Sequence, residues 1–153
     1  MDEKAKKILS KLETQCSKRE FCTSDIFAKA LKACEGDKEA AGEIIASLKA
    51  DRYVDDFRYA SAFAREKSSI SGWGPVKIRF ALNAKKVPAE AIEAAFEDID
   101  CDKAQDKLEK VMITKWKTLE GDPQAKLKLL KFALGRGYEY DEVREMAERI
   151  CRG

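Results

Sequence analysis

The sequence predicts an all-α fold of three tandem three-helix repeats, stacked into an elongated, curved array. An apolar quartet with the helical spacing i, i+3, i+4, i+7 occurs three times, and each occurrence is shifted by 51 positions in a chain of 153 residues. The tripeptide Phe-Ala-Leu at 80–82 also recurs at 132–134, and no segment shows the sustained apolar–polar alternation of a strand. The quartets are Ala41/Ile44/Ile45/Leu48, Ile92/Ala95/Phe96/Ile99 and Val143/Met146/Ala147/Ile150. We therefore expect repeats at 1–51, 52–102 and 103–153.

The first repeat predicts a helix over 4–17, a second from about 23 to 34, and a third that carries the first quartet. Thr23, with the two polar residues that follow it, offers side-chain oxygens to cap the second helix. Gly36 ends that helix, and Asp37 can cap the third.

The second repeat begins at Asp55 or Asp56, and its first helix stops near a Ser-Gly-Trp-Gly turn at 71–74. Pro75 suits the first turn of the next helix, because its missing N–H costs nothing there, and Pro88 plays a similar part before the second quartet. In the third repeat, Asp122 provides a cap followed by a first-turn proline. Gly135 and Gly137 end the second helix of that repeat. The aromatic side chains on the apolar faces are expected in the core; they are Phe63, Phe80, Phe96, Trp116 and Phe132.

Composition excludes several classes of protein. Apolar residues make up 44% of the chain and charged residues 38%, which excludes wholesale disorder and fits an all-helical protein. No apolar run approaches membrane-spanning length, and the N-terminus lacks the apolar stretch of a secretory signal. The five cysteines are odd in number and have no CxxC spacing, so neither a disulfide framework nor a zinc site is indicated. We expect a soluble, cytoplasmic monomer.

No feature supports an active site. The chain has no histidine, which removes the commonest general base, and it has no phosphate-binding glycine loop. The acid pair Asp55-Asp56 and the cluster Asp98/Asp100/Asp102 could hold a magnesium ion, but helix capping explains them better. We therefore expect no catalytic residue, no cofactor and no metal, and a binding protein rather than an enzyme.

Charge follows the repeat. Residues 58–86 hold seven bases against one acid, residues 87–102 hold six acids and no base, and residues 103–136 hold nine bases against four acids. The first two helices of the second and third repeats are therefore basic, although the net charge is only +2. Such a face suits phosphates or an acidic protein surface, unless these are ordinary solvated helix faces.

Three segments of the chain resemble segments of one known protein family. Residues 52–60, Arg-Tyr-Val-Asp-Asp-Phe-Arg-Tyr-Ala, are similar to a family segment written gY-hydrophobic-[ND]-D-x-x-[FY]-A. Gly74-Pro75-x-x-Ile78-x-x-x-Leu82 is similar to the family's G-P-x-x-I-x-x-x-L element. Residues 132–138, Phe-Ala-Leu-Gly-Arg-Gly-Tyr, look like the family's F-L-x-R-R-G-[FY] ending, and Lys86 stands where the family usually has glycine. On these three segments the chain resembles the RecX regulatory protein family.

The resemblance implies three three-helix repeats and a protein that binds the RecA recombinase in the groove of its filament on DNA. It implies inhibition of the recombinase's ATPase and strand exchange, and limited filament growth. We expect the basic helices to supply the contact face to the recombinase and to DNA within or beside the filament. The expected contact residues are Arg58, Arg65, Lys67, Lys77, Arg79, Lys85, Lys115, Lys128, Lys131 and Arg136. The residues themselves also allow a nucleic-acid-binding helical repeat acting alone, or a generic protein-interaction scaffold.

Overall fold

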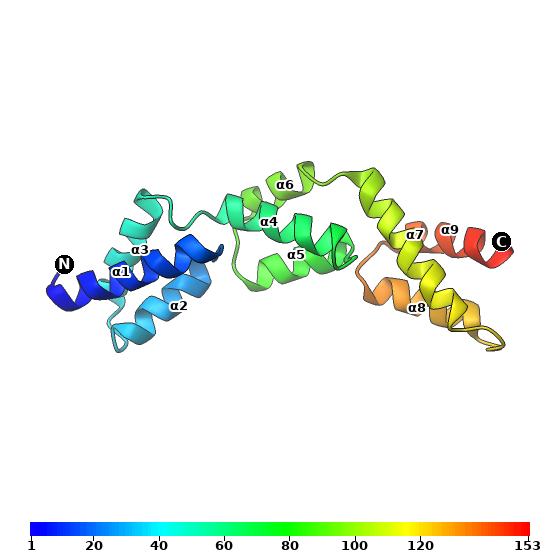
Figure 1. Cartoon of the computed structure of the whole chain (residues 1–153), viewed down its shortest axis with the longest axis horizontal. Coiled ribbons are helices and arrows are strands. Elements are labelled where there is room, and N and C mark those ends of the chain that lie inside the picture. Colours follow the sequence, from blue (N-terminus) through cyan, green and yellow to red (C-terminus); the bar gives the residue numbers. More distant parts are fainter. The chain divides into compact units, whose positions relative to one another are not determined.

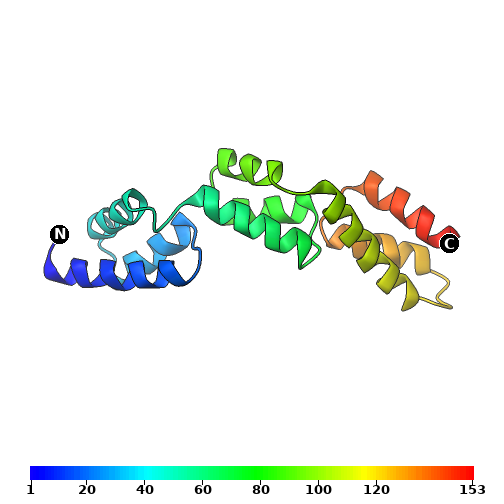
Figure 2. The same ribbon diagram turned by 45° about the horizontal axis from the view of Figure 1, so that its top comes forward.

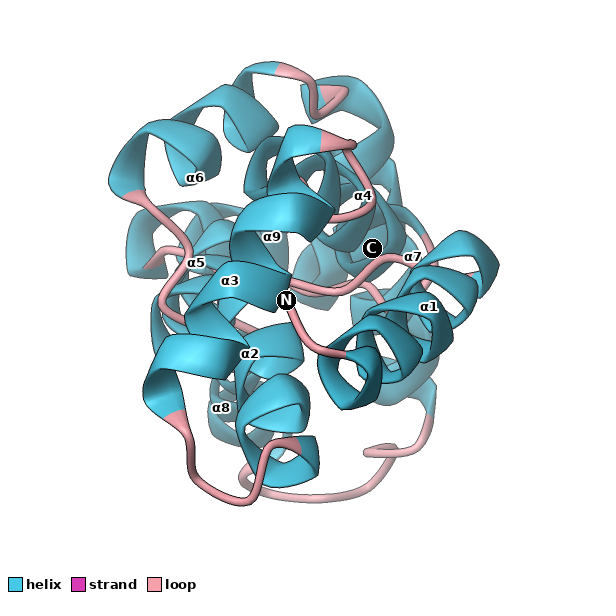
Figure 3. Ribbon diagram, turned by 90° about the vertical axis from the view of Figure 1, so that its left-hand side faces the viewer, coloured by secondary structure: helices cyan, strands magenta, loops and turns pink.

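The computed structural model describes residues 1–153 and contains nine α-helices and no strand (Figures 1 and 3). The all-α prediction is therefore confirmed. No helix combines the length and the apolar character needed to cross a membrane. The helices are α1 (Glu3–Lys18), α2 (Thr23–Ala33), α3 (Lys38–Ala50), α4 (Asp56–Ser69), α5 (Pro75–Ala84), α6 (Ala89–Glu97), α7 (Cys101–Lys117), α8 (Ala125–Gly135) and α9 (Tyr140–Arg152).

Aspartate side chains begin several of these helices. The Asp37 carboxylate accepts a hydrogen bond from the Ala40 N–H at 3.1 Å, as the sequence predicts. Asp55 accepts from two N–H groups of the first turn of α4 at 2.9 and 3.2 Å, and Asp100 accepts from two N–H groups of α7 at 3.0 and 3.2 Å. Asp55 and Asp100 thus cap helices, and Asp56 accepts a hydrogen bond from the Thr23 N–H at 2.8 Å. At Asp122 the side chain caps a turn, and α8 begins later, at Ala125.

In each repeat, a residue with positive φ lies two positions after the last residue of the second helix, and these residues are again 51 positions apart. They are Glu35 at +56°, Lys86 at +58° and Gly137 at +94°. At Lys86 the N–H of Val87 donates to the carbonyl of Leu82 at 3.2 Å, which closes a Schellman turn around the left-handed residue. Lys86 therefore takes up the backbone conformation for which glycine is favoured, at a cost in strain.

The chain forms two compact units. Unit 1 comprises residues 1–62 and 82–95, and unit 2 comprises residues 63–81 and 96–153. The expected repeat boundary at 51/52 lies in the turn after α3, and the one at 102/103 lies at the second residue of α7.

The core of unit 1 lies among α1, α2 and α3, which pack side by side in Figures 1 and 2. The whole first quartet is buried there, together with Leu12 and Ile26. Burial of these side chains is the main favourable contribution to folding of this unit.

The core of unit 2 lies among α7, α8 and α9. Three members of the third quartet are buried, and the fourth, Ile150, is half-buried. In the second quartet Ile92 and Ala95 are buried, whereas Phe96 and Ile99 are half-buried and Ile99 lies beyond the end of α6. The helical period therefore predicts the core faces well, apart from Phe96, Ile99 and Ile150, which are half-buried.

One aromatic prediction is wrong. Phe80 is 75% exposed, although the sequence places it on an apolar face of the second repeat. Its neighbours Ile78 and Leu82 are buried, so the core-facing side of α5 lies two positions either side of Phe80. Residues two apart in a helix do not share a face, so Phe80 lies on a different side of α5 from Ile78 and Leu82. The recurrence of Phe-Ala-Leu does not distinguish these two sides.

Candidate partner-binding surface

Two loops of unit 2 meet in a close backbone contact, which we call the glycine clasp (residues 71–76 and 136–138). The Gly74 N–H donates to the Arg136 carbonyl at 2.7 Å, and the Val76 N–H donates to the Gly137 carbonyl at 2.9 Å. A Cβ at Gly74 would lie 2.4 Å from the Gly137 oxygen, and a Cβ at Gly137 would lie 2.2 Å from the Lys77 Cβ. Both positions therefore require glycine for close approach of the backbones.

Two side chains from the α8–α9 loop close the clasp. Arg136 Nη2 donates to the Ser71 carbonyl at 2.7 Å, and the Tyr138 hydroxyl donates to the Gly72 carbonyl at 3.0 Å. Burial raises the pKa of Tyr138 to about 12, because the charged phenolate would be poorly solvated there. Arg136, expected to bind a partner, thus also positions the loop before α5.

A basic groove lies between α7 and α8 on the surface of unit 2. Its volume is about 410 Å³, and four bases line it: Lys107, Lys110, Lys115 and Arg136. Phe132 contributes an apolar wall, and the Lys115 ammonium lies 5.5 Å from its ring centroid. Four cations around one groove create a positive potential that attracts phosphate or carboxylate groups.

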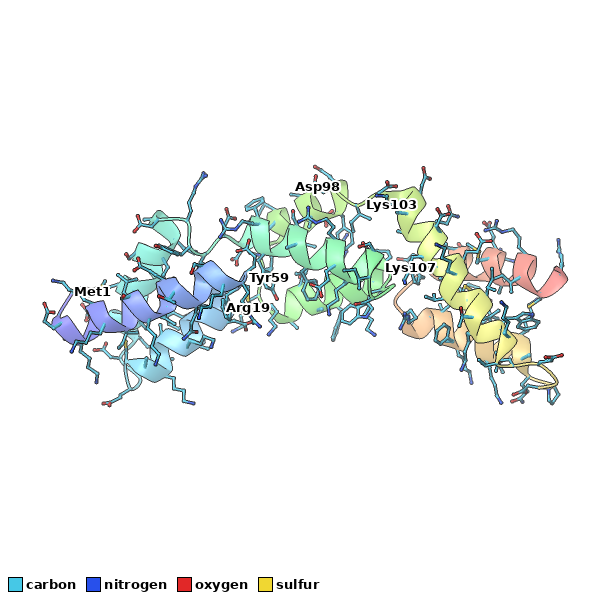
Figure 4. The ribbon with its side chains drawn as sticks, in the orientation of Figure 1. Met1, Arg19, Tyr59, Asp98, Lys103 and Lys107 are labelled. Atoms are coloured by element: carbon cyan, nitrogen blue, oxygen red, sulfur yellow. The ribbon has the colours of Figure 1, made fainter.

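Two of the four groove bases come from the sequence prediction, and two were missed. Lys115 and Arg136 were expected, whereas Lys107 and Lys110 were not. Lys107 lies on α7 one turn after Lys103 (Figure 4). A helical-face reading of 107, 110, 111, 114, 115 and 118 could have found the missed pair, because these positions recur at steps of three and four.

A second group of bases in unit 2 lies against aromatic rings. Trp73 has the Lys67 ammonium 4.8 Å and the Lys77 ammonium 4.4 Å from its ring, and Phe63 meets it edge-on at 6.1 Å. The Arg79 guanidinium lies 4.6 Å from the Phe96 ring. These cation–π contacts restrain the three bases close to the protein surface.

The remaining expected bases of unit 2 lie on α4 and α8. Lys128 forms an ion pair with Asp122. The hydrogen bond that Lys128 donates is the largest cause that lowers the pKa of the Asp122 carboxyl, and the hydrogen bond from the Gln124 N–H is the second largest. Arg65 and Lys131 are exposed. Eight of the ten expected contact residues therefore belong to unit 2.

The other two expected bases belong to unit 1, and both are ion-paired there. Arg58 binds Glu20, and its Nη2 also donates to the carbonyls of Arg52 and Tyr53 at 3.0 and 3.3 Å. The hydrogen bond to Glu20 is the largest cause of the raised pKa of Arg58. The Lys85 ammonium lies 3.0 Å from an Asp25 carboxylate oxygen. Both bases thus tie segments of unit 1 together, and their role in partner contact stays a prediction.

Unit 1 has an aromatic cluster of its own near the end of α1, where Arg19 and Tyr59 are labelled in Figure 4. The Arg19 guanidinium lies 4.2 Å from the Phe21 ring centroid, and the Lys29 ammonium lies 5.3 Å from it. Burial is the largest cause that raises the pKa of Tyr59 to about 12.

Comparisons with known proteins agree on one family. Residues 55–95 match the family model described as the second three-helix domain of RecX. The chain is similar to the regulatory protein RecX of Salmonella arizonae, with 32% identity over 94 residues, which cover 61% of this chain and 56% of that protein. The RecX of Oceanobacillus iheyensis is 32% identical over 96 residues, which cover 63% of this chain and 35% of that protein.

Solved structures show the same fold at lower identity. A crystal structure of regulatory protein RecX superposes with a TM-score of 0.84 at 21% identity, covering 96% of this chain and 72% of that one. The crystal structure of RecX from Lactobacillus salivarius superposes with a TM-score of 0.83 at 17% identity, and the full length of both chains is covered. That full-length match supports three three-helix repeats. RecX is a family of regulatory proteins and not of enzymes. By the family model and the curated relatives, this chain resembles the RecX regulatory protein family, and it spans about a third to just over half of the length of those two relatives.

Proposed function

We propose that this chain binds the RecA recombinase and its filament on DNA, inhibits ATP hydrolysis and strand exchange, and limits filament growth. It would act in the cytoplasm as a monomer, without a cofactor. A ligand that binds one assembly state more tightly than another shifts the assembly equilibrium by that difference in affinity.

The observation that carries the proposal is the basic groove of Lys107, Lys110, Lys115 and Arg136. A filament of recombinase on DNA presents both phosphates and protein carboxylates, and a groove lined by four cations suits either. The groove also adjoins the glycine clasp through Arg136, whose second role there holds the guanidinium in place.

The test is the DNA-dependent ATPase rate of the cognate RecA on single-stranded DNA, measured while this protein is added from substoichiometric to equimolar amounts. We expect a dose-dependent fall in the rate. In the variant Lys107→Glu/Lys110→Glu the concentration for half-inhibition should rise about tenfold or more, since reversed charges in the groove repel the partner. The matched control is Lys7→Glu/Lys11→Glu on α1, which changes the net charge by the same amount at two exposed positions of unit 1.

Binding to bare single-stranded DNA, measured at several salt concentrations, separates the two kinds of contact. If the groove binds phosphates, the groove variant should lose affinity for DNA and show a shallower salt slope than the control. If it binds recombinase carboxylates, DNA binding should be equal in both variants. An unchanged ATPase rate at equimolar protein, with filaments intact and no association detected, would refute the proposed function. Equal inhibition by both variants would refute the groove as its site.

A further inference from the structure

The helices α5 and α8 differ from the other seven in charge. Each of the others has an aspartate or glutamate in its first turn, whereas α5 and α8 have none there and none anywhere along their length. An acid in the first turn stabilises a helix through the helix dipole. Its absence from both helices therefore does not serve folding, and lysine and arginine are the only charged residues within them.

These same two helices expose large apolar side chains. On α5, Phe80 is 75% exposed and Val76 is 48% exposed; on α8, Leu127 is 47% exposed and Leu134 is 38% exposed. Val76 and Phe80 are four positions apart on α5, and Leu127 and Leu134 are seven positions apart on α8. Each pair therefore lies on one face of its helix. Val76 and Leu127 also correspond under the 51-residue period.

The glycine clasp brings the start of α5 and the end of α8 together within unit 2. Because the Val76 N–H donates to the Gly137 carbonyl, the first turn of α5 lies against the end of α8. In Figure 1 the start of α5 and the end of α8 adjoin accordingly. We call this surface the α8–α5 face; it consists of Leu127, Leu134, Val76 and Phe80, with Lys131 and the Asp122-paired Lys128 on the exposed side of α8.

We propose that the α8–α5 face binds an acidic amphipathic helix of a partner protein. Its apolar residues would pack against Phe80, Val76, Leu134 and Leu127, and its carboxylates would meet the bases of α8. α8 has 11 residues, and residues 75–81 of α5 lie in unit 2. At 1.5 Å per residue, their summed length is close to that of a partner helix of about 20 residues. The inference deepens the proposed function, because it names the kind of surface that the recombinase or another partner would present.

The chemistry of the face favours protein over nucleic acid as its occupant. Three of the four exposed apolar side chains are aliphatic, and aliphatic side chains do not stack on bases. They gain most by burial against other apolar side chains, so the mixture of aliphatic and basic residues complements an amphipathic acidic helix. Only Phe80 could serve as a stacking platform.

The experiment compares three probes with the full-length chain. The first is the RecA filament on single-stranded DNA held with a slowly hydrolysed ATP analogue. The second is a 20-residue peptide with leucines at helical spacing i, i+4, i+7, i+11 and glutamates between, alongside a scrambled peptide of the same composition. The third is a bare single-stranded oligonucleotide. The variants are Val76→Ser/Phe80→Ser and Leu127→Ser/Leu134→Ser, and the control is Ile70→Ser, which is 70% exposed but lies outside both helices.

Each variant should lose about tenfold or more in affinity for the filament and for the ordered peptide, while the control and the scrambled peptide show no such effect. Affinity for the oligonucleotide should stay unchanged. An equal loss on the oligonucleotide would overturn the inference in favour of base stacking. Undiminished binding of filament and peptide would overturn it while the proposed function stands. If the wild-type chain binds the peptide but not the filament, the inference stands and the proposed function fails.

Discussion

Replacing Gly137 with alanine should destabilise unit 2 by about 2–5 kcal/mol. The φ of Gly137 is +94°, and a side chain in the left-handed region costs about 1–2 kcal/mol. The new Cβ would also lie 2.2 Å from the Lys77 Cβ and 2.6 Å from the Lys77 nitrogen. The structure can relieve that overlap in two ways. Either the neighbouring atoms shift, at an overpacking cost of about 1–3 kcal/mol, or the two loops separate and lose two backbone hydrogen bonds at a similar cost.

The assay is urea unfolding followed by tryptophan fluorescence, because both tryptophans, Trp73 and Trp116, lie in unit 2. The matched control is Gly121→Ala. Gly121 belongs to the same unit and has a φ of +81°, but nothing lies within 4 Å of its added Cβ. It should therefore lose only the backbone term, about 1–2 kcal/mol. Equal losses in the two variants would show that close approach at the clasp contributes nothing, and the reasoning would be refuted.

Three further outcomes are expected. Gly42→Ala should stabilise unit 1 by about 0.8–1 kcal/mol in urea unfolding followed by circular dichroism, because Gly42 lies inside α3 with open space at its Cβ; a loss of stability would contradict this. Lys86→Gly should stabilise unit 1 by about 1 kcal/mol, since glycine relieves the strain at φ +58°, and an unchanged urea midpoint would show no strain there. The pKa of Tyr138 is raised to about 12 from 10.0, so its contribution to the stability of unit 2 is fully present below pH 10 and is lost as pH rises through 12. Tyr138→Phe should reduce that alkaline loss and cost about 1 kcal/mol at pH 7, measured by urea unfolding at each pH; an identical pH slope in the variant would place the titration elsewhere.

The helices and most of the core follow from local rules that a sequence carries by itself. The quartet spacing predicts the buried faces of α3 and α9, since residues three and four apart share a helix face wherever the helix lies. Asp37 and Pro75 begin their helices as expected, because a cap needs only its own first turn. The 51-residue period predicts three repeats because each three-helix group repeats the same local pattern.

Features that depend on contacts between residues distant in the sequence could be found only from the tertiary structure. Gly74 and Gly137 look like ordinary turn glycines, yet each is required by the backbone of the other loop, more than 60 positions away. Arg58 and Lys85 look like free surface bases, but folding pairs them with Glu20 and Asp25, 38 and 60 positions away.

The candidate site divides in the same way. Charge along the chain predicts that the helices of the second and third repeats are basic, since composition alone decides that. The groove formed by Lys107, Lys110, Lys115 and Arg136 arises only when α7 packs against α8. The exposure of Phe80 likewise depends on which side of α5 meets its neighbours. Local periodicity thus determines which residues share a helix face, and packing decides which of those faces is left for a partner.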